Sequence, residues 1–104
     1  MSCAWCGTAV AAGEGFRAYE PAGARKATFC RLEHIVPWAI RGAFWEPDGE
    51  PPAAEIAPEC AHCRAPLGDA PVLLLRERGE HRVGDGFCSV EHLLEWAKAG
   101  GRYR

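Results

Sequence analysis

The sequence lacks a long hydrophobic run and an export leader, and it has few bulky apolar residues. It contains no hydrophobic run long enough for a transmembrane helix and no basic, apolar leader that would indicate export. Much of its 48% hydrophobic fraction is alanine, which buries little surface, and 12 glycines and 8 prolines predict many turns. We therefore expect a cytoplasmic protein without a large apolar core, stabilised by something else.

An excess of one charge is also missing. The chain has 12 Lys and Arg against 14 Asp and Glu, a formal net charge of -2 at pH 7, which gives no general attraction for phosphates. Nucleic-acid binding would need a local patch, and the candidates are Arg25, Lys26 and Arg31; Arg76, Arg78 and Arg82; and Lys98, Arg102 and Arg104. Because small clusters of this kind are more often solvated faces, nucleic acid is the alternative partner and another protein the first expectation.

What the sequence does have is six cysteines. They could form three disulfides or bind metal, and the absence of an export signal favours metal or redox chemistry. A thioredoxin-like interpretation of the two Cys-x2-Cys pairs lacks the βαβ context that it needs. Cysteines as buried small hydrophobes or as disulfide partners remain the weaker alternatives.

The cysteines belong to an internal duplication. Residues 3–6 recur at 60–63, and residues 29–39 align without gaps to 87–97, with Phe, Cys, Glu, His, Trp and Ala shared. Each copy reads Cys-x2-Cys, then 23 or 24 residues, then Cys-x3-His. A segment rich in proline and acid separates them, so we predict module 1 over 1–46, a linker over 47–57 and module 2 over 58–104.

The duplication predicts the same elements twice. Strand-like residues 16–19 and 26–29 flank a turn at 21–24, and strand-like residues 72–76 and 82–87 flank a turn at 78–80. Helices are expected over 31–44 and 89–98, and Pro37 should bend the first of them. The fold class is small α+β, with two tandem modules that each contain a zinc knuckle, a β-hairpin and one helix.

Eight residues have the types and spacing that suit Zn²⁺. A Cys-x2-Cys turn places two sulfurs on one side of a loop, and Cys-x3-His places two further donors on one face of a helical turn. The predicted metal ligands are Cys3, Cys6, Cys30 and His34, and Cys60, Cys63, Cys88 and His92. Four protein ligands close the shell of each of the two zinc ions, so we expect structural sites, no catalytic residues and no enzyme activity.

The start of each helix is predicted to support its site. If Cys30 and Cys88 are the N-caps, the helix dipole favours their thiolates. Glu33 and Glu91 then fall at N3, where a carboxylate can complete a capping box. The aromatic residues expected to pack around the ligands are Phe29, Trp38, Phe87 and Trp96.

The whole pattern resembles the treble-clef zinc fingers of the TRASH, FCS and MYM type. In these families a Cys-x2-Cys knuckle precedes a hairpin, and a Phe-Cys-Ser segment opens the helix that carries the fourth ligand. Residues 87–89 match that segment as they stand, and residues 29–31 match it except for the serine. The fourth ligand is commonly Cys in such families and is His in both copies here. The resemblance implies binding of protein or nucleic acid, with metal handling in some members.

Five other residues carry weaker signals. Trp5 and His62 occupy equivalent knuckle positions, where either could dock a partner or pack locally, and His81 is expected at the surface. Phe44 and Trp45 could bury against the second module. We predict a zinc-binding adaptor or accessory module, with a nucleic-acid-binding zinc finger as the alternative and metal storage or sensing as the second alternative.

Overall fold

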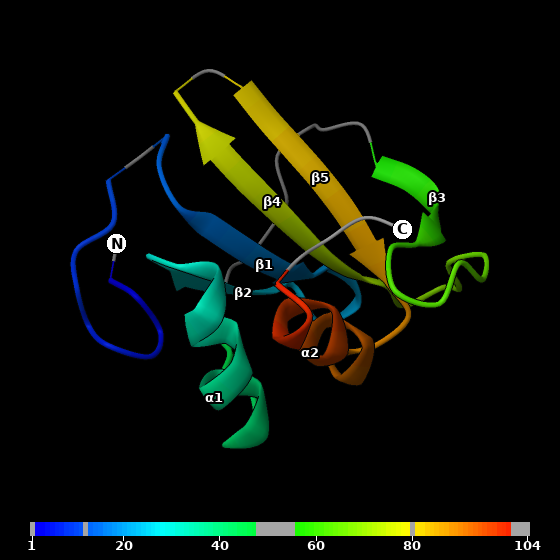
Figure 1. Cartoon of the computed structure of the whole chain (residues 1–104), viewed down its shortest axis with the longest axis horizontal. Helices are drawn as coiled ribbons and strands as arrows, with labels where there is room; N and C mark the ends of the chain where they lie inside the picture. The colour runs from blue at the N-terminus through cyan, green and yellow to red at the C-terminus, as the bar shows by residue number, and fades with distance from the viewer. Residues whose placement is uncertain (1, 12, 48–55, 80, 101–104) are drawn as a thin grey trace.

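The structure is a computed structural model, and it describes residues 2–11, 13–47, 56–79 and 81–100 (Figure 1). It is a small α+β fold with one five-stranded sheet and two α-helices. The elements in chain order are β1 (Phe16–Glu20), η1 (Pro21–Gly23), β2 (Arg25–Phe29), η2 (Leu32–His34), α1 (Ile35–Ile40), β3 (Ile56–Cys60), β4 (Val72–Arg78), β5 (His81–Phe87) and α2 (Val90–Lys98).

Both predicted hairpins are present. β1 pairs antiparallel with β2, β4 pairs antiparallel with β5, and the strand order in the sheet is β2-β1-β4-β5-β3. β3 pairs with β5 in the parallel direction at one edge. The β-branched, aromatic and leucine residues of these segments explain why they form strands.

The two repeats join through their first strands, β1 and β4. In the hairpins, Phe16 lies opposite Phe29 and Val72 lies opposite Phe87, so Phe16 and Val72 are equivalent positions. Two residues further along each strand, the equivalent residues Ala18 and Leu74 lie opposite each other in the β1–β4 ladder. The repeats are therefore related by a pseudo-twofold axis at this pair, as two subunits of a symmetric dimer would be.

The shared sheet answers a point that the sequence leaves open, namely whether the repeats pack together. They form one continuous sheet, and buried residues of both belong to one apolar cluster. The boundaries of the two predicted modules stay a prediction. Most of the predicted linker, 48–55, lies outside the described residues, and its last residues, 56 and 57, belong to β3.

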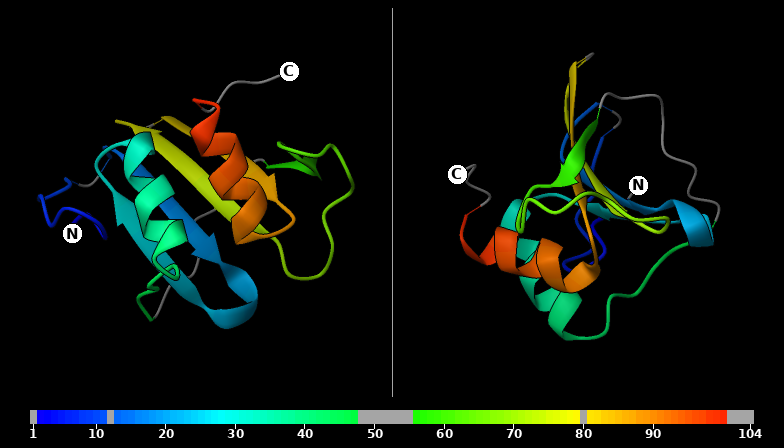
Figure 2. Two further views of the ribbon diagram at one scale, coloured as in Figure 1. Left: turned by 60° about the horizontal axis from the view of Figure 1, so that its bottom comes forward. Right: turned by 90° about the vertical axis from the view of Figure 1, so that its right-hand side faces the viewer.

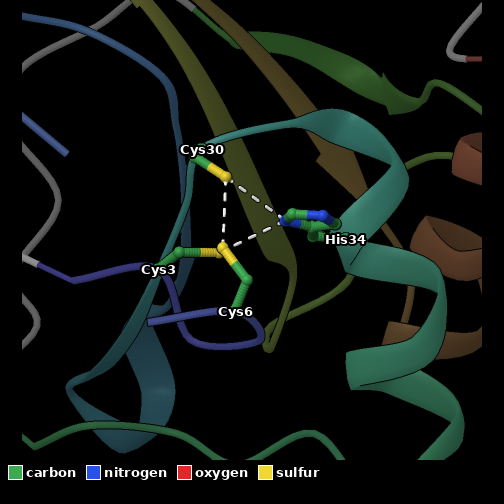
Figure 3. A group of neighbouring side chains, drawn as sticks. All are labelled: Cys3, Cys6, Cys30 and His34. Atoms are coloured by element: carbon green, nitrogen blue, oxygen red, sulfur yellow. Dashed lines mark hydrogen bonds between the residues drawn. The ribbon is translucent and has the colours of Figure 1, made fainter. Parts of the chain in front are cut away.

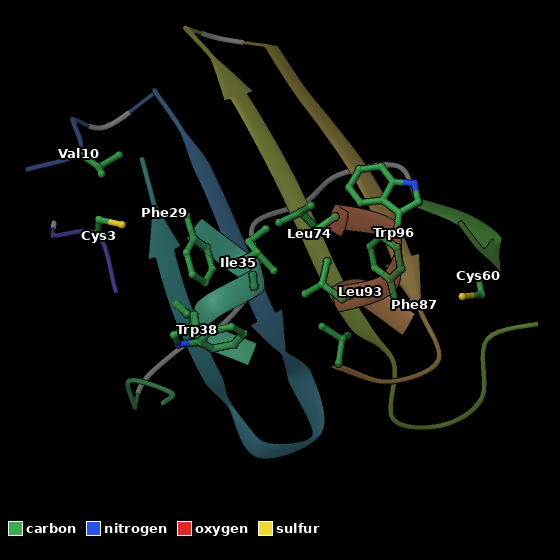
Figure 4. Close-up of a cluster of buried hydrophobic side chains, with 14 residues drawn as sticks. Cys3, Val10, Phe29, Ile35, Trp38, Cys60, Leu74, Phe87, Leu93 and Trp96 are labelled. Atoms are coloured by element: carbon green, nitrogen blue, oxygen red, sulfur yellow. The ribbon is translucent and has the colours of Figure 1, made fainter. Parts of the chain in front are cut away.

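α1 and α2 contact each other and cover the same face of the sheet (Figures 1 and 2). Beneath them lies the core, in which the largest apolar side chains are Phe29, Ile35, Trp38, Leu74, Phe87, Leu93 and Trp96 (Figure 4). Phe29 contacts Trp38 edge-on at 5.0 Å between ring centroids, and Phe87 contacts Trp96 at 5.2 Å. The duplicated Phe and Trp thus form duplicated core contacts.

The predicted first helix is shorter than expected. A single 3-10 turn, η2, precedes α1, and the helix ends at Ile40, before two residues with positive φ, Gly42 and Ala43. Pro37 is consequently in the first turn of α1, where its missing N–H would have no helical partner, so the expected bend is not required. The second helix agrees with its prediction, and Gly100 follows it with φ 84°.

The expected cap residues are wrong by one position. Ser89, not Cys88, is the N-cap of α2, and its side chain accepts a hydrogen bond from the His92 N–H at 3.3 Å. This places Glu91 at N2 and His92 at N3. In the first repeat Arg31 holds the corresponding extended position before η2 and forms no side-chain cap. The serine therefore helps to explain why the second helix is the longer and better defined of the two.

The burial of Phe44 and Trp45 against the second repeat is not observed. Phe44 is 67% exposed. Trp45 packs within its own repeat, with its ring 5.0 Å from that of Trp38 and 5.7 Å from the Arg25 guanidinium. The Trp38 indole also donates to the Phe44 carbonyl at 2.9 Å, which holds this segment against α1.

No helix in the described ranges is long and apolar enough to cross a membrane.

Candidate metal centres

The structure brings the first predicted group of ligands together. Donor atoms of Cys3, Cys6, Cys30 and His34 all lie within 4.8 Å of one another. Figure 3 shows the four side chains converging from three places: the N-terminal knuckle, the end of β2 and the end of η2. Cys30 Sγ lies 3.5 Å from Cys6 Sγ and 3.3 Å from His34 Nδ1, and Cys3 Sγ lies 3.5 Å from the same nitrogen.

A short hydrogen-bonded turn presents the two knuckle sulfurs. The Cys3 N–H donates to the Thr8 carbonyl at 2.8 Å, and the Gly7 N–H donates back to the Cys3 carbonyl at 3.0 Å. Gly7 has φ 77°, which favours glycine. The Ala4 N–H donates to the Thr28 carbonyl of β2, and this bond fixes the knuckle beside the strand that ends at Cys30.

The second group repeats this construction. Its donor atoms also lie within 4.8 Å of one another, and they belong to Cys60, Cys63, Cys88 and His92. The Cys60 N–H donates to the Ala65 carbonyl at 2.8 Å, and the Arg64 N–H donates to the Cys60 carbonyl at 2.9 Å. Arg64 stands where the first copy has Gly7 and adopts φ 67°, which costs a non-glycine residue about 1 kcal/mol.

The knuckle of the second copy is fixed to its hairpin in the same way. The Ala61 N–H donates to the Gly86 carbonyl of β5, as Ala4 does to β2. A Cβ at Gly86 would come 2.4 Å from a methyl group of Leu67, so a larger residue there would require the Leu67 side chain to shift. The duplication seen in the sequence is therefore also a duplication of backbone hydrogen bonds.

The distances fit a tetrahedral metal site. With Zn–S of about 2.3 Å and Zn–N of about 2.0 Å, a tetrahedron has S···S edges of about 3.8 Å and S···N edges of about 3.6 Å. The second group has Cys63 Sγ to Cys88 Sγ at 3.6 Å and Cys60 Sγ to His92 Nδ1 at 3.7 Å, close to both values. The two groups could therefore hold two metal ions, with Nδ1 as the imidazole donor.

The disulfide alternative does not match this geometry. All six cysteines are free thiols. The pairs Cys6–Cys30 and Cys63–Cys88 are separated by 3.5 and 3.6 Å between sulfurs, whereas a disulfide bond is about 2.0 Å long. Sulfur atoms at that separation suit two corners of one coordination shell.

The thiols of the first group ionise unequally. Thr8 Oγ1 lies 3.1 Å from Cys6 Sγ, and hydrogen bonds from the Thr8 hydroxyl and backbone N–H to the thiolate lower the pKa of Cys6 to about 6. Burial raises the pKa of Cys30 to about 11, and hydrogen bonding with Cys6 and Cys3 adds to the effect. Without metal, the group thus contains one readily formed thiolate and one thiol that keeps its proton.

The second group shows the same inequality at different positions. Burial opposes ionisation of Cys60, yet hydrogen bonds from the backbone N–H groups of Cys63 and Cys88 bring its pKa down to about 6. A hydrogen bond with Cys63, followed by burial, raises the pKa of Cys88 to about 11. In both repeats the cysteine that precedes the helix has a raised pKa, so a metal ion must displace its proton on binding.

One contact beside the second group could not be predicted from spacing. The rings of His62 and His92 lie 5.1 Å apart and tilted by 53°, so the knuckle histidine packs on the ligand histidine. Trp5, at the equivalent position, is 41% exposed. His81 belongs to β5, but its side chain lies outside what the structure describes.

Comparisons with known proteins add no family to this description. No protein-family model, no curated protein and no solved structure matched the chain.

Proposed function

We propose that the chain is a structural zinc-binding protein that acts as a protein-interaction adaptor or accessory module. The observation that carries the proposal is the pair of Cys3His groups, each with four donor atoms within 4.8 Å of one another. Three thiolates and one imidazole are the donors that favour zinc, and four protein ligands leave no position for a reacting water. The sites would then stabilise the fold, and binding rather than catalysis would be the activity.

The described surface supports a protein partner. Ile40 and Phe44, four residues apart around the end of α1, are 63% and 67% exposed, although such side chains are usually buried. Exposed apolar side chains that lie close in sequence are candidates for a protein-binding surface. Arg41 lies between them in the sequence and is also exposed.

Nucleic acid is the less supported partner. Part of the predicted basic surface is occupied, because Arg25 pairs with Glu20 and Arg82 Nε lies 3.5 Å from Glu77 Oε1. A guanidinium that is paired with a carboxylate neutralises a phosphate less well. It therefore releases fewer counterions from a nucleic acid and adds less to the affinity. The acidic net charge of -2 points in the same direction.

Native mass spectrometry and partner capture would test the proposal. We expect two zinc ions per chain, and we expect proteins captured with the zinc-loaded chain from its own cells to be lost with Ile40→Ser and Phe44→Ser. Arg41→Gln would serve as the matched control and should retain them. Salt-dependent binding to random DNA or RNA, without capture of protein, would contradict the adaptor role in favour of the alternative.

A further inference from the structure

A cleft of about 620 Å³ opens where the two repeats meet, beside the first metal centre. The first repeat contributes Gly13, Glu14, Gly15, Phe16 and Cys30 to its lining, and the second contributes Arg76, Glu77 and Gly79. The volume is within the range of about 300–1,000 Å³ that is usual for ligand sites. A cleft built from both repeats exists only because they share one sheet.

The walls of the cleft are held by hydrogen bonds between the repeats. The Gly79 N–H donates to the Gly13 carbonyl at 2.7 Å, and the Glu77 N–H donates to the Gly15 carbonyl at 3.0 Å. A Cβ at Gly15 would come 2.7 Å from the Phe29 carbonyl oxygen, and one at Gly13 would come 3.1 Å from the Gly79 carbonyl oxygen. The glycines therefore allow a close approach of backbone that is already in place before a ligand binds.

Arg76 is the group in this cleft most suited to recognise a ligand. It lies opposite Phe16 in the β1–β4 ladder, and its guanidinium sits 5.2 Å from the centroid of the Phe16 ring. In the described part of the chain, Arg76 has no carboxylate partner. A guanidinium placed over an aromatic ring can still offer N–H groups to a ligand, and a guanidinium edge matches a carboxylate with two parallel hydrogen bonds.

The pseudo-twofold symmetry shows that the arrangement is particular to one side. The position equivalent to Arg76 in the first repeat is Glu20, and the position equivalent to Phe16 in the second is Val72. Glu20 is paired with Arg25, so that side has neither the ring contact nor an unpaired cation. The fold therefore does not require the Arg76–Phe16 pair, which makes a binding role the better explanation for it.

Charge indicates the kind of ligand. Near the cleft, the described part of the chain has three guanidinium groups, of Arg17, Arg76 and Arg82, and two carboxylates, of Glu14 and Glu77, which leaves one positive charge in excess; Arg17 and Arg82 both contact Glu77. A filled Cys3His zinc centre alongside would carry a net charge of about -1. With a filled zinc centre the local sum is therefore about zero. Of these described groups, Arg76 is the one cation without a carboxylate partner, so it matches a single carboxylate, and no second positive charge is left over for a doubly charged phosphate.

We propose that this cleft binds an acidic side chain of a partner peptide, with Arg76 as the carboxylate receptor. The proposal rests on the proposed role in protein interaction and gives that role a second contact surface, separate from Ile40 and Phe44. The peptide lies across the junction between the repeats, and its carboxylate accepts hydrogen bonds from the guanidinium edge.

The test uses the full zinc-loaded chain and two probes, observed through the backbone amide NMR signals of Gly13, Gly15 and Gly79. The first probe is a capped pentapeptide with one glutamate between alanines, compared with its glutamine counterpart, and the second is inorganic phosphate. We expect saturable shifts with the glutamate peptide only. Arg76→Gln should weaken binding on the order of 10-fold or more, because a hydrogen-bonded charge pair is lost.

Two further variants separate recognition from folding. Arg76→Lys keeps the charge but loses the planar fork, so its affinity for the glutamate peptide should lie between those of the wild type and Arg76→Gln. Arg41→Gln is remote in sequence from the cleft, and its affinity should equal that of the wild type. Absence of saturable shifts, shifts unchanged by Arg76→Gln, or shifts with phosphate alone would overturn the proposal. If partner capture through Ile40 and Phe44 persists in that case, the cleft proposal fails and the adaptor role stands.

Discussion

Arg17 of β1 and Glu77 of β4 form a buried ion pair between the two repeats, with Arg17 Nη1 2.8 Å from Glu77 Oε2. Their side chains are only 4% and 9% exposed. The Gly13 N–H also donates to the Glu77 carboxylate, and Arg17 donates to the carbonyls of Ala11 and Glu14. The pair therefore ties the N-terminal segment and both repeats together where β1 and β4 meet in the shared sheet.

Removal of one partner is expected to destabilise the protein strongly. Glu77→Gln leaves the Arg17 guanidinium buried without its counter-charge, and such changes cost about 3 kcal/mol or more. Arg17→Met with Glu77→Leu removes both charges and should cost much less, because neither residue is then left unpaired. Urea unfolding of the zinc-loaded proteins measures both. Equal losses for the single and double variants would show that the charges do not act as a pair.

The local features of the fold could be predicted from the sequence because they depend on short-range patterns. The eight metal donors follow from spacing, and the hairpins follow from strand-like residues on either side of a turn. The pairing of β1 with β4 could not be predicted, because the alternation of apolar and polar residues along a strand does not show which other strand it pairs with. For the same reason, the sequence does not predict that Arg17 and Glu77, 60 residues apart, are partners.

The N-cap expected for the second helix is one residue early for a different reason. Cys88 and Ser89 are both able to precede a helix, and the metal-based argument favours the cysteine. In the structure the serine accepts the hydrogen bond from the His92 N–H, which leaves Cys88 before the helix and aimed at the metal group. The metal ligand and the cap are thus adjacent residues with separate roles.

Loss of a metal ligand is expected to affect more than its own repeat. Cys30→Ser and Cys88→Ser should each leave one zinc ion per chain by native mass spectrometry. Each structural zinc contributes apparent folding energy on the order of 10 kcal/mol. Because both repeats share one sheet and one core, either variant should also lower the urea midpoint of the remaining half. Independent unfolding of one half, with the other unchanged, would contradict this coupling.

Zinc binding is expected to release protons and to weaken as the pH falls. The pKa of Cys30 and the pKa of Cys88 are both raised to about 11, so at neutral pH each of these thiols must lose a proton to the solvent when metal binds. Cys6 and Cys60, with pKa values of about 6, take up protons only below that pH and then oppose binding further. Calorimetric zinc titrations in two buffers of different ionisation enthalpy would count the protons. Binding heats that do not depend on the buffer would show that these thiols are already ionised.

Exchange of the residues that precede the two helices provides a matched pair of variants. Ser89→Ala removes the side-chain acceptor of the His92 N–H and should lower the free energy of unfolding by about 1 kcal/mol. Arg31→Ser places the missing serine at an extended position, φ -142° and ψ 151°, close to that of Ser89.

Arg31→Ser should consequently raise the free energy of unfolding by up to about 1 kcal/mol, because a helix start without a cap gains one. Urea unfolding of both zinc-loaded variants tests the pair, and circular dichroism would report the accompanying change in helix content. If Arg31→Ser has no effect while Ser89→Ala destabilises, the shorter first helix is set by Pro37 and the 3-10 turn rather than by the absent cap.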